Sequence, residues 1–168
     1  RNSLVGIGVR DEVRIIAAGR IVTGFDAVTK MALGADLCNS ARGMMFALGC
    51  IQAVKCNTNH CPVGVATQDP GLTKALHVGD KSARVASFQR ETVESIMELL
   101  GAAGLSHPSD LRPCQISRRI SATDTRTYEE IYDLLDPGAL LAEPYPDAFD
   151  KPWRAARADS FRRWPGAA

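Results

Sequence analysis

The fold is decided by residues 13–43, which read VRIIAAGRIVTGFDAVTKMALGADLCNSARG. Residues 13–17 form a short apolar run that is typical of a buried strand, and Gly19 lies in the turn that ends it. A second short run covers residues 35–39, in which Cys38 is expected to face the core. Two such runs separated by a helical pattern predict parallel strands joined by a crossover helix.

The crossover helix is predicted over residues 24–33. Thr23 and Asp26 stand at the spacing of a capping box, and Gly34 is suited to the left-handed residue that follows a helix. A second helix is expected from about residue 43 to residue 52. The order strand, helix, strand, helix therefore predicts the α/β class.

The rest of the chain changes in character after residue 54. Residues 55–72 have no helical or strand period and are rich in Asn, Pro, Gly and Cys, which is typical of a functional loop. An apolar stripe with charged flanks predicts a long helix over residues 80–103. A capping box that begins at Thr127 predicts another helix through Leu135.

We divide the chain into three parts on this basis. Residues 1–79 are expected to hold the βα units and the cysteine loop, and residues 80–140 a helical extension that packs on them. Residues 141–168 are expected to form an irregular tail with a short helix over residues 154–161. Trp153 and Trp164 are expected to pack this tail against the body.

Length and charge exclude several classes of protein. The 168 residues are too few for a complete (β/α)8 barrel, which typically needs about 250 residues. A net charge of +1 predicts no broad surface for nucleic acid. The longest apolar stretch, residues 31–54, is interrupted by polar and charged side chains, so we expect no membrane span. We see no secretory leader and therefore expect a cytoplasmic protein. Because the sequence starts at Arg1 rather than Met, we expect a processed product or a piece of a longer chain.

Three cysteines, Cys50, Cys56 and Cys61, stand at the spacing C-x5-C-x4-C. Without a secretory leader, cysteines this close together favour a metal site over disulfides. Three thiolates on one loop suit an iron–sulfur cluster with three ligand positions, or a zinc ion if His60 or another group supplies a fourth ligand. The alternative is that Cys50 is a small buried residue at a helix end and that the other two are incidental.

Small residues follow each predicted strand. Gly19 follows the first strand, and Ala41, Arg42 and Gly43 follow the second. Backbone N–H groups at such turns, beside a guanidinium, form an anion site, and turns after consecutive parallel strands lie side by side. In a (β/α)8 barrel this is the usual place for a phosphate. The alternative is ordinary turn chemistry, in which glycine serves only the backbone.

The block from residue 15 to residue 70 resembles the flavin-binding domain of the glutamate synthases. GRIVTG at residues 19–24, followed by GAD at residues 34–36, resembles the seventh βα unit of that domain. GCI, CNTN and CPVGVATQDP, which begin at residues 49, 56 and 61, resemble its iron–sulfur loop. The remaining residues look more like the stand-alone FMN-binding glutamate-synthase-like proteins than the large multidomain enzymes.

The resemblance implies about the last two βα units of a (β/α)8 TIM barrel, with an iron–sulfur loop, a long helix and an irregular tail. It also implies FMN and a 3Fe-4S cluster as cofactors. The implied site residues are three cluster ligands and four residues at the phosphate turns, namely Cys50, Cys56, Cys61, Gly19, Ala41, Arg42 and Gly43. The large enzymes often have Gly-Thr where this chain has Ala41-Arg42, and an Arg here is similar to other FMN barrels, in which it pairs with the phosphate.

The complete enzymes of the family transfer the amide nitrogen of glutamine to 2-oxoglutarate and reduce the resulting imine to glutamate. The resemblance therefore implies an oxidoreductase whose substrates are 2-oxoglutarate and glutamine or another amino donor. The first six βα units of the barrel would precede residue 1, so we expect the isolated chain to be inactive and not to bind FMN tightly by itself. No catalytic residue is assigned, since neither a glutaminase nucleophile nor a G-x-G-x-x-G loop is visible.

Three other functions remain open. The chain would be a non-catalytic FMN and iron–sulfur electron-transfer module if a partner chain supplied the other barrel strands. It would be a subunit of an N-methylglutamate synthase if methylamine were the amino donor. It would be a structural zinc domain if the cysteines held zinc, and the iron and zinc contents separate that possibility from the others.

Overall fold

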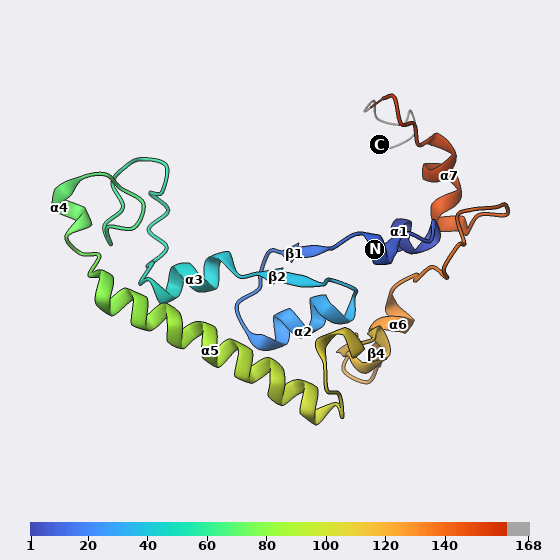
Figure 1. Cartoon of the computed structure of the whole chain (residues 1–168), viewed down its shortest axis with the longest axis horizontal. Coiled ribbons are helices and arrows are strands. Elements are labelled where there is room, and N and C mark those ends of the chain that lie inside the picture. The colour runs from blue at the N-terminus through green and yellow to red at the C-terminus, as the bar shows by residue number, and fades with distance from the viewer. Residues whose placement is uncertain (161–168) are drawn as a thin grey trace.

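The computed structural model describes residues 1–160 and has mixed helices and strands, which confirms the α/β class. Figure 1 shows an elongated molecule with a small α/β unit in its middle. The cysteine loop and α4 (Pro70–Thr73) lie at one end, and α7 (Asp147–Ala155) lies at the other. The longest helix, α5 (Val78–Ala102), runs from the loop along the α/β unit.

The α/β unit consists of β1 (Ile16–Ala18), α2 (Gly24–Ala32) and β2 (Leu37–Asn39), and the two strands are parallel as predicted. The first strand begins at residue 16 rather than at residue 13. The reason lies at Ile15, whose N–H donates to Asp36 Oδ2 over 2.7 Å and whose carbonyl accepts from the backbone N–H of Asp36. The carboxylate of Asp36 thus takes the place of a backbone partner for the Ile15 N–H, just before the strand pairing begins at Ile16.

The predicted signals at both ends of α2 are confirmed. Thr23 and Asp26 form the capping box, with the Asp26 N–H donating to Thr23 Oγ1 over 3.1 Å. Gly34 has φ of 99°, and the N–H groups of Gly34 and Ala35 donate to the carbonyls of Met31 and Lys30. This pair of bonds is the Schellman motif, which ends the helix one turn before β2.

The helix after β2 differs from its prediction. It was expected over residues 43–52, and α3 covers Ala41–Ala47. Gly49, with φ of 97°, ends it by a second Schellman motif, in which the Cys50 N–H donates to the Met45 carbonyl over 2.9 Å. Cys50 therefore lies just outside the helix, at the start of the cysteine loop.

The main core lies where α2 crosses α5. Its most buried members come from these two helices and from the segment that follows α5: Val28, Ala32, Leu100, Leu111 and Ile116. The apolar stripe predicted on α5 is confirmed, because Val85, Phe88, Ile96 and Leu99 are half-buried and Leu100 is only 1% exposed. Burial of this stripe against α2 fixes the long helix beside the sheet.

Short elements follow α5. Two turns of 3-10 helix, η2 (Pro108–Asp110) and η3 (Pro113–Gln115), lead into a hairpin of β3 (Ser117–Arg119) and β4 (Thr125–Thr127) that the sequence did not predict. The predicted capping box at Thr127 is present, but α6 covers only Tyr128–Ile131. The chain leaves the helix at Tyr132.

The reason for this early end is a second, smaller core at the N-terminus. After α6 the chain crosses to α1 (Asn2–Gly6), where the Leu140 N–H donates to the Gly6 carbonyl over 2.9 Å. Leu135 and Leu140 are 9% and 3% exposed there. Gly6 allows this approach, because a Cβ on Gly6 would lie 2.6 Å from the Leu140 side chain. A further turn of helix through Leu135 would forgo this contact. Before β1, Arg10–Glu12 form the 3-10 turn η1.

The tail also differs from its prediction in part. Its helix was expected over residues 154–161, and α7 covers Asp147–Ala155 instead. Arg154 lies in the last turn of α7, where its Nε donates to Asp150 Oδ1 over 2.7 Å, so Arg154 is near the end of the helix and not at its start. Trp153 is half-buried, and Trp164 lies outside the described residues.

Candidate functional site

The two predicted phosphate turns lie at one edge of the sheet. In the parallel ladder Ala18 is opposite Asn39, so the turns that follow β1 and β2 start side by side. Ser40 joins them, since its Oγ donates to the Ile21 carbonyl over 2.7 Å. The structure therefore brings together Gly19 and the segment that begins at Ala41, as the sequence predicted.

The first turn contains two consecutive residues in the left-handed region. Gly19 has φ of 92° and Arg20 has φ of 55°, and both are exposed. A Cβ at Gly19 would meet no atom within 4 Å, so glycine is favoured here by backbone conformation rather than by space. The N–H groups of Val22 and Thr23 already donate to the carboxylate of Asp26, which leaves the residues before Val22 as the open part of this turn.

The second turn is open at its start. No side chain caps α3, and Ala41 and Arg42 are exposed. Gly43 is buried instead, because a Cβ there would lie 2.5 Å from Ser40 Oγ and 2.7 Å from the Phe88 ring. Gly43 thus serves the packing of α3 on α5, while Arg42 lies exposed in the first turn of α3.

The three candidate ligands lie on the loop after α3 in different surroundings. Cys50 is half-buried, Cys56 is exposed and Cys61 is buried. Two cations of α5 flank the start of the loop: a Cβ at Gly49 would lie 3.3 Å from Lys81 Nζ and 3.7 Å from Arg84 Nη1.

Cys61 has the most distinctive surroundings of the three. Backbone N–H groups of Ala66 and Val63, and then of Val65 and Gly64, donate toward its sulfur and lower the pKa of its thiol. Burial opposes this effect, but the N–H groups prevail. Backbone donors around one sulfur favour a negatively charged atom there, so these surroundings favour the thiolate form of Cys61, which is the form that ligates a metal.

The conformation around Cys61 is fixed by contacts across the loop. Asn59 accepts at both of its oxygens: Thr67 Oγ1 donates to its carbonyl over 2.6 Å, and the Gln68 N–H donates to its Oδ1 over 2.7 Å. Gly64 has φ of 77°, and a Cβ there would lie 2.5 Å from the Leu72 carbonyl oxygen. Only glycine fits that place, and it allows the chain to fold back over Cys61.

The other half of the loop is not packed. Residues 51–60 are all exposed, and Gln52 and Val54 have φ of 57° and 54°. Val54 is β-branched and 86% exposed, so nothing buried compensates for a conformation that costs about 1–3 kcal/mol. Within residues 1–160, no three His, Cys, Asp or Glu side chains converge on a point that would hold a metal ion. The three cysteines share a loop, and their sulfurs do not meet in this conformation.

Cys38 faces the helix side of the sheet, as expected. Its Sγ lies 3.8 Å from the Ala27 carbonyl of α2, and burial raises the pKa of its thiol. Cys114 and His60 are exposed. Thr58 and Asn59 hydrogen-bond within the loop: Thr58 Oγ1 donates to the Lys55 carbonyl, and Asn59 Oδ1 accepts from the Gln68 N–H.

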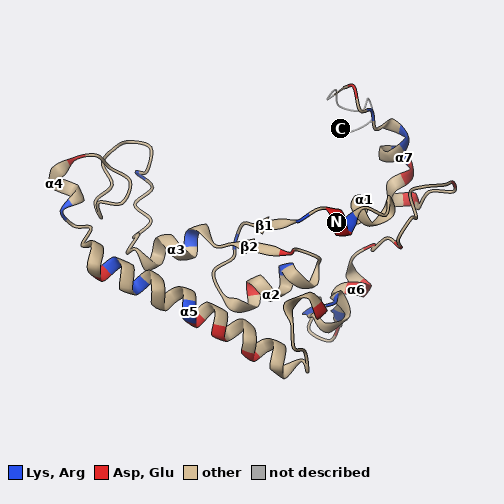
Figure 2. Ribbon diagram, viewed as in Figure 1, with Lys and Arg blue, Asp and Glu red and all other residues tan. Residues whose placement is uncertain are grey.

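Charge on the surface is mixed, with Lys and Arg interspersed with Asp and Glu along α5 (Figure 2). Sequence reasoning missed one concentration of charge, a pocket lined by arginines at the opposite edge of the sheet. Its residues come from positions 1–14, 31–37 and 107–113, and no sequence spacing links such distant segments. In the part of the chain that the structure describes, no helix has the length and apolarity that a bilayer crossing requires.

Comparison with known proteins defines the family. The sequence model described as the conserved region in glutamate synthase matches residues 1–106, which include both phosphate turns and the cysteine loop. The chain belongs to the glutamate synthase family. The match ends near the end of α5, so the resemblance of residues 107–168 to the stand-alone proteins stays a prediction.

Individual relatives agree with this assignment. The glutamate synthase large subunit-like protein YerD of Bacillus subtilis is 46% identical over 101 residues, which are 60% of this chain and 19% of YerD. The archaeal glutamate synthase (NADPH) of Methanocaldococcus jannaschii is 41% identical over 105 residues, 62% of this chain and 21% of that protein. The large chain of the Bacillus subtilis glutamate synthase (NADPH) is 35% identical over 97 residues, 58% of this chain and 6% of the large chain. The chain thus spans about a fifth, or less, of the relatives it matches.

Proposed function

We propose that this chain is part of the FMN- and iron–sulfur-binding domain of a glutamate-synthase-like oxidoreductase. In the complete protein the reaction is the reductive transfer of an amino group to 2-oxoglutarate, which gives glutamate. The main support for this proposal is that one loop holds three cysteines and directs backbone N–H groups toward the sulfur of Cys61. Membership of the glutamate synthase family supports the same conclusion.

The chemistry of the donors fits an iron–sulfur cluster. Cys61 is the preformed ligand, Cys50 is placed by the end of α3 beside the cations of α5, and Cys56 lies on the unpacked half of the loop. The cluster supplies one-electron transfer, and N–H groups that point at ligand sulfurs tune its potential. We propose that residues 51–60 rearrange when Cys56 joins the other two ligands, which would release the backbone strain at Val54.

The edge of the sheet fits a phosphate. Arg42 and the uncapped start of α3 lie beside the turn of Gly19, and Ser40 holds the two turns together. Phosphate oxygens accept from backbone N–H groups and from a guanidinium, so these residues would bind and orient the phosphate of FMN. FMN supplies hydride and electron transfer when it is bound. Gly43 contributes indirectly, by allowing α3 to lie against Phe88.

Two exposed apolar side chains on the sheet support its assignment to an incomplete barrel. Cys38 faces α2, whereas the partners Ile16 and Leu37 point to the other face and are each 55% exposed. In a (β/α)8 barrel, the face away from the helices is the filled interior. We propose that β1 and β2 are two strands of such a barrel, with residues 1–79 as its βα units, residues 80–140 as an extension and residues 141–168 as a tail. The other strands would come from the rest of the parent protein or from a partner chain.

Cluster assembly provides the test. Anaerobic incubation with iron and sulfide should give a broad visible absorption in the wild-type chain, and Cys56→Ala should remove it. Cys114→Ala is the matched control, since Cys114 is equally exposed but lies outside the loop. An unchanged spectrum in Cys56→Ala, or an equal loss in Cys114→Ala, would refute the ligand assignment. Uptake of zinc without iron would favour the structural zinc domain instead.

A further inference from the structure

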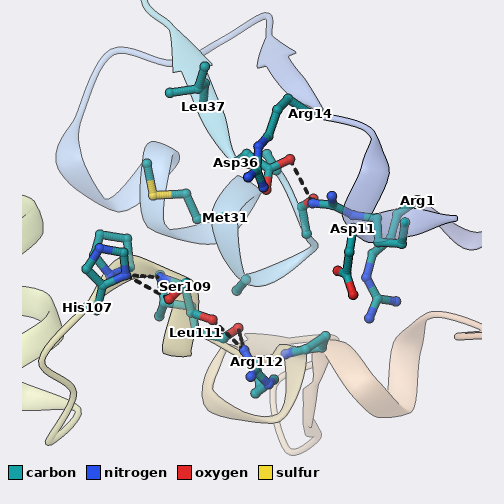
Figure 3. A pocket seen from close by; sticks show the side chains of 16 residues that line it. Arg1, Asp11, Arg14, Met31, Asp36, Leu37, His107, Ser109, Leu111 and Arg112 are labelled. Atoms are coloured by element: carbon teal, nitrogen blue, oxygen red, sulfur yellow. Dashed lines mark hydrogen bonds and ion pairs between the residues drawn. The ribbon is translucent and has the colours of Figure 1, made fainter. Parts of the chain in front are cut away.

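A pocket of about 790 Å³ lies at the edge of the sheet opposite the phosphate turns. It is bounded by the residues that lead into β1 and β2 and by the segment that contains η2, and Figure 3 shows its charged side chains. The volume is within the range of small-molecule sites. Because both phosphate turns follow the strands whereas this pocket precedes them, it is a separate site.

The pocket contains more positive than negative side chains. Six charged residues line it, four of them arginines: Arg1, Arg10, Arg14, Arg112, Asp11 and Asp36. Asp36 is shared by two of the cations, since its Oδ2 lies 2.8 Å from Arg10 Nη2 and its Oδ1 lies 3.6 Å from Arg14 Nη1. Among residues 1–160, neither Arg1 nor Arg112 has a carboxylate within ion-pair distance.

The two arginines without carboxylate partners differ in how they are held. Arg112 Nη1 donates to the carbonyls of Ser109 and Leu111 over 2.7 and 2.9 Å, which fixes the guanidinium, and its other N–H groups have no hydrogen-bond partner among residues 1–160. Burial lowers the pKa of Arg1, and the positive charges of Arg10 and Arg112 lower it further. Arg1, Arg10 and Arg112 line the same pocket, so one ligand bound there would meet all three positive charges.

We propose that this pocket binds a small organic anion that carries two or more phosphate or carboxylate charges. Guanidinium groups bind both kinds of oxyanion with paired hydrogen bonds. The lining also includes apolar side chains, among them Met31 and Leu111, which suit the carbon part of such a ligand. The proposal concerns the amino-terminal edge of the strands and does not depend on FMN or on the cluster.

Calorimetric titration of the chain with pyrophosphate, and separately with citrate, tests the proposal and distinguishes the two oxyanions. One molecule of at least one probe should bind per chain, and the affinity should fall as salt is raised. Arg112→Gln should weaken binding about 10-fold, because one charge-assisted contact is lost. Arg90→Gln is the matched control, since Arg90 is an exposed residue of α5 away from the pocket, and it should leave the affinity unchanged.

Arg14→Gln keeps the test valid if Arg112→Gln disturbs the fold. The Arg14 side chain is 74% exposed, so its replacement should leave the melting temperature unchanged and still weaken binding. The proposal is wrong if neither probe binds below millimolar concentration, or if both pocket variants bind as the wild type does. Loss of binding in Arg42→Gln with retention in Arg112→Gln would place the anion at the other edge of the sheet and would also overturn it.

Discussion

Ala18 and Asn39 are opposite partners at the ends of two parallel strands. This single pairing places the turn of Gly19 beside the turn that begins at Ala41, and Ser40 Oγ then joins the turns through the Ile21 carbonyl. The cysteine loop leaves the same region after only seven residues of helix. The proposed phosphate turns and the proposed cluster ligands are therefore connected through α3.

Core packing holds this arrangement in place, and Leu100 is its most buried side chain. Leu100→Ala should lower the free energy of unfolding by about 2–5 kcal/mol, because it removes buried methyl groups and leaves a cavity between α2 and α5. Leu141→Ala is the matched control: Leu141 is 68% exposed, and its truncation should cost less than about 0.5 kcal/mol. Urea unfolding of both variants makes the comparison. Equal effects would contradict the assignment of the core.

Asp36 should make the stability of the sheet depend on pH. The Ile15 N–H, followed by Arg10, lowers the pKa of the Asp36 carboxyl group below its unfolded value of about 3.9. A carboxylate of this kind stabilises the fold above the unfolded pKa, and the contribution is lost as the pH falls through the folded pKa. Asp36→Asn should therefore lower the melting temperature at pH 7 and have a smaller effect near pH 2. An equal effect at both pH values would show that the charge of Asp36 is not involved.

Cys61 should ionise more readily than an ordinary thiol. The N–H groups of Ala66 and Val63 lower its pKa, so the midpoint of its alkylation by iodoacetamide should lie below about 8.5 in the folded apo chain. Peptide mass spectrometry over a pH series measures this midpoint separately for each cysteine. In denaturant the donors are dispersed, and the midpoint should rise to the ordinary value. A folded midpoint at or above the denatured one would argue against the donor ring.

FMN should bind only weakly to the isolated chain. On our proposal the turns at Gly19 and Arg42 would provide contacts for the phosphate, whereas the strands that would cover the exposed Ile16 and Leu37 and hold the flavin ring lie outside this chain. Titration followed by flavin fluorescence should show no sub-micromolar affinity, and Arg42→Gln should weaken whatever binding is present. Sub-micromolar binding to residues 1–168 alone would contradict the incomplete barrel.

Local signals predicted the elements whose ends are set by local hydrogen bonds. The capping box of Thr23 and Asp26 and the left-handed Gly34 fix α2 within a residue of the prediction. The same chemistry explains the error at α3: Gly49 carries the end signal, and the apolar residues after it concealed that signal. At α6 the local capping box was right, but contact between Leu140 and α1 decides where the helix ends.

The candidate site was predictable to a similar extent. Short spacing along the chain identified Cys50, Cys56 and Cys61, and strand order placed the two phosphate turns together. The donor ring around Cys61 depends on how the next five residues fold back, which spacing does not specify. The arginine pocket joins Arg10 with Arg112, about a hundred residues apart along the chain, and only the tertiary fold brings them together.

Metal analysis of the anaerobically reconstituted chain tests the central claim most directly. If Cys50, Cys56 and Cys61 hold a 3Fe-4S cluster, the purified chain should retain about three iron atoms with matching acid-labile sulfide, and replacement of any one of these cysteines should abolish that retention. Retention of no iron by the wild-type chain, or of about one zinc ion in its place, would contradict the account.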